Sequence, residues 1–308
     1  MKNIPTSEEI NSLFANSDAE EVWAKALGIA RRINPDYDPT LARTVFDDVM
    51  RLFRGEFPGY CDIKTLYHNL PHTLDVFLCA VRLIHGVHVL GTRIHDDEIT
   101  LVMVATLMHD VGYAQPLGAE TGTGAQFTES HVRRSVEFMR RCLVERQFPP
   151  GFADLLEPII LSTDPGLTFS QLDFPDERSR LLGKIVGTAD LTGQMADRTY
   201  LEKLLFLYLE FKEANFGNYR NIHDLLRQTE KFYENTRNKL DGELGGMYAH
   251  LAFHFKDTLG VENNYYLESI EKNIAYLSKV ISLNEAECLS MLKRGGIVEK
   301  SKALVVPG

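Results

Sequence analysis

The sequence predicts an all-α protein, and two observations carry this prediction. Apolar residues recur at helical spacing over most of the chain, in segments separated by glycine, proline and capping residues. The alternating pattern of a β-strand is absent except at 303–306. Because the 308 residues contain no internal repeat and no low-complexity linker, we expect one all-α domain over 1–308.

Composition and charge narrow the class of protein. Hydrophobic residues make up 44% and charged residues 25%, which is typical of a soluble protein with a full core. A net charge of −10 argues against binding of nucleic acid by bulk charge, although it allows a small phosphorylated substrate.

Cysteine usage and the N-terminus bear on location. The four cysteines are scattered without a C-x-x-C pair, so we expect neither a disulfide framework nor a thiolate zinc site. Residues 1–9 lack the apolar core of a secretion signal, and no run reaches transmembrane length. These features predict a cytoplasmic protein without membrane association.

The N-terminal part, 1–60, is expected to form a helical cap that packs on the core. Residues 6–55 have the pattern of two or three amphipathic helices. One begins near Asp18 and ends at Asn34-Pro35, and the next begins after Pro39 and ends at Gly55.

A long apolar helix follows in 64–90. Pro71 is tolerated only in the first turn of a helix, so the ordered helix is expected to begin near Leu70. His72 then lies in its first turn, and His68 precedes the helix. The two imidazoles are neighbours in either arrangement.

A second apolar helix, capped at Asp96 or Asp97, closes on the doublet His109-Asp110 before Gly112. Packing does not explain a carboxylate at the end of a buried helix, because an unpaired buried charge is costly. A metal ion would compensate it.

Two later helices carry further candidate ligands, and one of them again has a carboxylate at the end of an apolar stretch. A helix that follows Thr128 carries His131 in its first turn, and a helix that starts at Asp176 carries Asp190 at the end of an apolar stretch. Beyond Thr199 the pattern is helical almost throughout, in segments punctuated by glycines: 201–216, 222–240, 247–259, 263–281 and 284–292.

We therefore predict a divalent metal site in the central part of the chain, 61–200. Its ligands are His72, His109, Asp110 and Asp190, a mixed set that Zn, Mn, Mg, Fe, Ni or Co can share. A metal held in this way lowers the pKa of bound water, and His68 would act as the general acid.

The other histidines are assigned more simply. His85, His88 and His95 are expected at the surface around a turn. His250 and His254 form a second i, i+4 pair, but no acidic doublet accompanies them, which disfavours a metal site there. For His131, a role as a metal ligand and a role in packing are both open.

The same residues resemble the HD-domain metal-dependent phosphohydrolases, and among them the catalytic domain of class I cyclic-nucleotide phosphodiesterases. Residues 67–76 are similar to the block Y-H-N-x-x-H-x-x-D-V of that family, and His109-Asp110 to its H-D pair. Residues 129–131, 160–164 and 189–192 resemble its E-N-H-H, I-L-A-T-D and A-D-L-S blocks, and all five blocks keep the order of the family.

The resemblance implies an HD-type, phosphodiesterase-like helical bundle with the metal ligands and the proton donor named above. Asn69 and Asp75 would orient the histidines, and Glu129, His131 and Asp164 would belong to the second shell or to a second metal. This chain departs from the family at Tyr113, where the phosphodiesterases have a histidine, and it has one histidine where E-N-H-H has two. One metal site is expected, and a second is left open.

The expected function is hydrolysis of a phosphomonoester or phosphodiester, nucleotides included, by metal-activated water. A non-catalytic module that senses a nucleotide or metal and a di-iron HD-fold oxygenase are the alternatives. Substrate-binding residues are unassigned, although Arg133, Arg134 or Lys184 would suit a phosphate. Residues 201–308 would complete the pocket or form the surface of a homo-oligomer.

Overall fold

The computed structural model describes residues 10, 13–14 and 18–305, with side chains as far as Ser301. Within these residues it is helical, and one isolated antiparallel bridge joins Tyr60 and Pro116. The α-helices are α2 (Ala19–Ile33), α3 (Thr40–Phe53), α4 (Leu70–Val89), α5 (Asp96–Met108), α6 (His131–Glu145), α7 (Phe152–Leu161), α8 (Glu177–Ala196), α9 (Tyr200–Glu213), α10 (Ile222–Asp241), α11 (His250–Leu259), α12 (Tyr265–Val280), α13 (Glu285–Met291) and α14 (Ile297–Val305). Short 3-10 helices are η1 (Val111–Tyr113), η2 (Ala125–Phe127), η3 (Phe169–Gln171), η4 (Met247–Ala249) and η5 (Arg294–Gly296).

The all-α prediction is confirmed, and local capping explains where several helices begin. The side chains of Asp18, Asn69 and Asp176 each accept a hydrogen bond from the backbone N–H three residues later, at the start of α2, α4 and α8. Such a bond satisfies one of the N–H groups that a helix leaves unpaired at its first turn.

One expectation at the C-terminal end is wrong. Residues 303–305, for which a strand was the alternative, form the last turn of α14, and residue 306 lies outside the described residues. A short apolar run cannot be assigned to strand or helix by periodicity alone, because it lacks a polar face in either case. Residues 1–9, on which the expectation of no secretion signal rests, are also outside.

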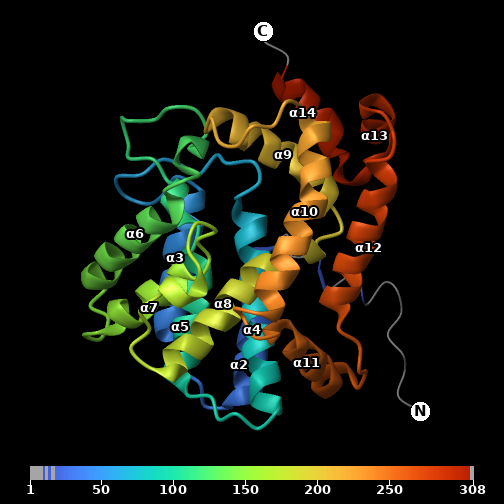
Figure 1. Ribbon diagram of the computed structural model, residues 1–308. Helices are drawn as coiled ribbons and strands as arrows, with labels where there is room; N and C mark the ends of the chain where they lie inside the picture. Colours follow the sequence, from blue (N-terminus) through green and yellow to red (C-terminus); the bar gives the residue numbers. More distant parts are fainter. Residues whose placement is uncertain (1–9, 11–12, 15–17, 306–308) are drawn as a thin grey trace.

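Two helices, α4 and α5, form the centre of the molecule (Figure 1). α4 packs against α2, α5, α8 and α11 and is buried over nearly its whole length from His72 to Val87. Every residue of α5 from Glu98 to Met108 is buried. A helix that is apolar on all sides is expected inside the core, and these two elements place the C-terminus of α5 and the N-terminus of α4 in the interior.

α4 is also long and apolar enough to cross a membrane by length and composition. In this structure 83% of its most apolar window is buried by other helices. Burial of this kind is characteristic of the core helix of a soluble protein.

Around this centre lie two groups of helices (Figure 1). α6 and α7 cover one side, and α10 and α12 lie on the opposite side. α9 contacts both α14 and the short helix η2, so it links the C-terminal helices to the segment between α5 and α6. This segment carries part of the candidate site.

Candidate metal centre

Asn69 and Pro71 place His72 at the beginning of α4. The Asn69 side chain accepts a hydrogen bond from the His72 N–H at 3.2 Å, and Pro71 occupies the first turn. His68 lies before the helix, so the two histidines are not successive residues of one helical face. Their ring centroids are nevertheless 5.6 Å apart.

α5 ends at Met108, and the turn that follows directs His109 and Asp110 toward His72. The His109 Nδ1 lies 2.8 Å from the carbonyl oxygen of Thr106. A carbonyl only accepts, so Nδ1 carries the proton and Nε2 of the neutral ring presents a lone pair. This bond therefore fixes which nitrogen faces the site.

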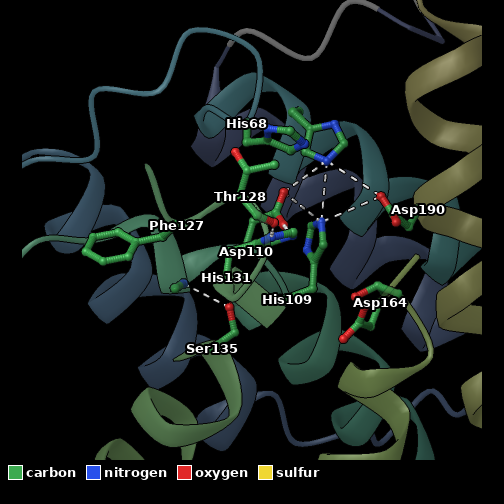
Figure 2. Close-up of polar contacts among 12 residues, drawn as sticks. His68, His109, Asp110, Phe127, Thr128, His131, Ser135, Asp164 and Asp190 are labelled. Carbon is green, nitrogen blue, oxygen red and sulfur yellow. Dashed lines mark hydrogen bonds and ion pairs between the residues drawn. The ribbon is translucent and has the colours of Figure 1, made fainter. Parts of the chain in front are cut away.

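His72 meets three further side chains at this point, those of His109, Asp110 and Asp190, which Figure 2 labels. Oδ2 of Asp110 lies 3.2 Å from Nε2 of His72 and 3.1 Å from Nε2 of His109. The two Nε2 atoms are 3.4 Å apart. Asp190, from α8, places Oδ1 3.6 Å from His72 and 3.7 Å from His109.

The distances among His72, His109 and Asp110 suit ligands of one metal ion, and Asp190 lies slightly farther away. With ligand bonds of about 2.1 Å, two ligands of one ion lie roughly 3.0–3.4 Å apart at tetrahedral or octahedral angles. The Asp110 Oδ2 is buried and has no hydrogen-bond donor, although two imidazole nitrogens surround it. A buried carboxylate oxygen that faces imidazole nitrogens requires either a proton or a metal ion between them.

The pKa values show how the cluster holds charge without a metal. Burial opposes protonation of His109, but the charge of Asp110 outweighs it and raises the pKa of His109 to about 9. Burial likewise opposes ionisation of Asp110, but its histidine neighbours hold its pKa well below the usual range. Burial lowers the pKa of His72. A metal ion must displace the His109 proton, so its binding weakens as the pH falls.

His68 is held by Glu210, a residue of α9 that the sequence analysis did not single out. The Glu210 Oε2 lies 2.6 Å from His68 Nδ1, and Oε1 accepts the Tyr67 and His68 N–H groups at 2.6 and 3.3 Å. Burial lowers the pKa of His68, but the Glu210 carboxylate outweighs burial and raises it. The sequence marks Glu210 only as an acidic residue within an apolar helix. Glu202 of the same helix has the same feature, so the pattern does not distinguish them.

His131 approaches the other oxygen of Asp110. Its Nδ1 donates to the carbonyl of Thr128 at 2.6 Å, and its Nε2 lies 3.3 Å from Asp110 Oδ1. Gly112 makes this approach feasible, because a Cβ at that position would lie 1.9 Å from the carbonyl oxygen of His131. The Gly112 N–H also donates to Ser135 Oγ of α6 at 2.8 Å (Figure 2).

The remaining predicted residues have different surroundings. Asn69 caps α4, and Oδ2 of Asp75 lies 3.9 Å from Nζ of Lys203. Glu129 is exposed, and Asp164 accepts the N–H of Gly166 at 2.8 Å. Neither of the last two carboxylates joins the group formed by His72, His109 and Asp110.

Two expectations about basic and surface residues are corrected. Arg134 is not available for a phosphate, since it donates to the carbonyls of Gly112 and Ala114 at 2.7 and 2.8 Å and lies over the Phe127 ring. His85 is 1% exposed rather than at the surface, because α4 is covered on all sides, and its Nδ1 lies 3.1 Å from that of His254.

Comparison with known proteins places the fold. The chain is similar to the crystal structure of the phosphodiesterase domain of the rhodopsin phosphodiesterase of Salpingoeca rosetta, with a TM-score of 0.50 and 14% identity. The match covers 90% of this chain and 89% of that one. At this identity the likeness shows the fold alone, which is a phosphodiesterase-like helical bundle.

Comparison by sequence matches only part of the chain to a family. A family described as Npun_R2479-like matches residues 119–240, a stretch that includes His131, Asp190 and Glu210 but not His72, His109 or Asp110. No protein with a curated description matches the chain.

Proposed function

We propose that this protein is a metal-dependent phosphohydrolase that cleaves a small phosphomonoester or phosphodiester. The observation that carries the proposal is the buried group of His72, His109 and Asp110, with Asp190 beside it and the His68–Glu210 pair adjacent. The phosphodiesterase-like fold agrees with this chemistry but does not by itself assign it.

In this proposal, four residues bind the metal and His68 donates a proton. His72, His109, Asp110 and Asp190 would hold a divalent ion, which, when bound, supplies a water of lowered pKa and polarises a phosphoryl oxygen. Glu210 occupies Nδ1 of His68, so Nε2 is the nitrogen left to give a proton to the leaving oxygen. Glu210 raises the pKa of His68 and so favours the protonated ring.

The test compares three variants with the wild type on p-nitrophenyl phosphate, bis-p-nitrophenyl phosphate and cyclic mononucleotides, with Zn²⁺, Mn²⁺ or Co²⁺ added. Asp110→Asn should lose both the metal and turnover. His68→Asn should keep the metal but lose about 10²–10⁴-fold in rate, as expected for loss of a general acid. His95→Gln, at an exposed histidine, is the control.

Two outcomes would count against the proposal. Full activity of His68→Asn would remove the acid role of His68. Metal bound to the wild type without hydrolysis of any of these esters would favour a non-catalytic, sensing module.

A further inference from the structure

Asp190 is held less closely than the other proposed metal ligands. Its Oδ1 lies 3.6 and 3.7 Å from the Nε2 atoms of His72 and His109, whereas Oδ2 of Asp110 lies 3.2 and 3.1 Å from them (Figure 2). The Asp190 side chain is also 14% exposed, compared with 4% for Asp110. Because the χ2 torsion of an aspartate has a broad range, the orientation of this carboxylate depends on its hydrogen-bond partners.

Gln194, one turn later in α8, provides such a partner. Its Nε2 lies 3.1 Å from the backbone carbonyl oxygen of Asp190 and 3.5 Å from Oδ1, the oxygen that faces the histidines. Both of these oxygens only accept, so the amide nitrogen of Gln194, and not its amide oxygen, must face Asp190. The contact to Oδ1 is long, whereas the contact to the carbonyl fixes where the amide nitrogen lies.

The hydroxyl of Tyr67 fixes the other end of this amide. It donates to Oε1 of Gln194 at 2.8 Å, and Tyr67 is buried. Tyr67 is also held through its backbone, because its N–H donates to Oε1 of Glu210 at 2.6 Å. A buried hydroxyl or amide oxygen without a partner is costly, so Tyr67 and Gln194 constrain each other. Hydrogen bonds thus connect the segment before α4, through Gln194, to Asp190.

We propose that Gln194 is a positioning residue that holds the Asp190 carboxylate toward the metal, and that Tyr67 fixes the orientation of the Gln194 amide. The inference rests on the metal centre of the proposed function, but it concerns the affinity for the metal and not the reaction. Gln194 lies outside the sequence blocks that resemble the phosphodiesterases, the last of which is 189–192, so the resemblance assigns it no role.

The experiment measures the dissociation constants of Zn²⁺ and Mn²⁺ by competition with a chelator, without substrate. Gln194→Met keeps the length of the side chain but removes the donor, and it should weaken metal binding by about 10–100-fold, as is typical for loss of a residue that orients a ligand. Gln228→Met is the matched control, because Gln228 follows Asp224 by the same four residues on α10, outside the metal centre. It should bind the metal like the wild type.

Double variants show whether Gln194 acts through its neighbours. If the lost affinity comes from a misoriented Asp190, Gln194→Met should cost nothing further in the Asp190→Ala background. Tyr67→Phe should weaken metal binding in the wild type but not in the Gln194→Met background. A general loss of packing would instead add to the effect of either partner variant.

The results separate this inference from the proposed function. A folded Gln194→Met that binds the metal as tightly as the wild type would overturn the inference and leave phosphoester hydrolysis standing, as would an equal loss of affinity with and without the Asp190 side chain. Unchanged affinity in Tyr67→Phe would overturn the role of Tyr67. Weakened binding that requires Asp190, in a protein that hydrolyses none of the esters, would uphold the inference and count against the function. A wild type that binds no ion would overturn both.

Discussion

His68 and Glu210 form a pair whose chemistry depends on one hydrogen bond. Glu210 is 2% exposed and accepts from the His68 ring and from two backbone N–H groups. A carboxylate held in this way stabilises the protonated imidazole against the cost of burial. The pKa of His68, which precedes α4, is therefore raised by a residue of α9.

Replacement of Glu210 by glutamine should lower the pKa of His68. In the proposed role of His68 as general acid the protonated ring is the active form. The rate should then fall as the pH rises through this pKa, and in Glu210→Gln the fall should occur at lower pH. Titration of the His68 ring by nuclear magnetic resonance measures the shift without a substrate. Glu213→Gln is the control, because Glu213 lies one turn later in α9 and accepts from Thr123 and Ala125. Coincident titration curves would contradict the prediction.

Between elements, the close approach of α4 and α11 depends on Gly86. A Cβ at this position would lie 2.0 Å from the carbonyl oxygen of His250, a backbone atom that a rotamer change cannot move. Gly86 is buried next to His85, which pairs with His254, whereas His250 is half-buried.

Gly86→Ala should therefore destabilise the protein, whereas the same change in an open helix should not. Overpacking against backbone costs about 1–3 kcal/mol, which urea unfolding would measure as a lowered free energy of unfolding. Gly28 in α2 is the matched control: no atom lies within 4 Å of a Cβ placed there, and Gly28→Ala should stabilise by about 0.5–1 kcal/mol. Equal effects of the two substitutions would show that α4 and α11 separate at little cost.

At the scale of the whole molecule, buried neutral histidines make stability depend on pH. Burial lowers the pKa of His85 to about 4, despite the attraction of Asp257, and burial also lowers the pKa of His254. Over the range between this value and the ordinary pKa of histidine, the unfolded chain binds a proton that the folded chain does not. Stability should therefore fall as the pH falls through this range.

For His85 alone the loss between pH 7 and pH 5 is about 2 kcal/mol. Urea unfolding of the metal-free protein at both pH values measures it. The double variant His85→Gln/His254→Gln should lose less stability over this interval than the wild type, and His95→Gln should behave like the wild type. An unchanged slope in the double variant would assign the acid sensitivity to other groups.

Much of the fold could be predicted from the sequence because helices begin and end through local interactions. Capping by Asp18, Asn69 and Asp176 involves residues three apart, and the apolar faces repeat every three or four residues. The motifs also indicated four candidate metal ligands, His72, His109, Asp110 and Asp190. In the structure these side chains lie close together. Whether they bind a metal stays a prediction that the metal analysis tests.

Other features depended on contacts between residues far apart in the chain. Glu210 reaches His68 across 142 positions, and no local pattern distinguishes it from Glu202, which is also buried in α9. His85 looked like a residue near a surface turn, but packing on every side of α4 buries it. The sequence alone thus determined the helices and the candidate ligands, which follow from local spacing. Only the tertiary structure decided that Tyr113 stacks on both His68 and His131 and that Glu210 contacts His68, because both depend on how separate elements pack.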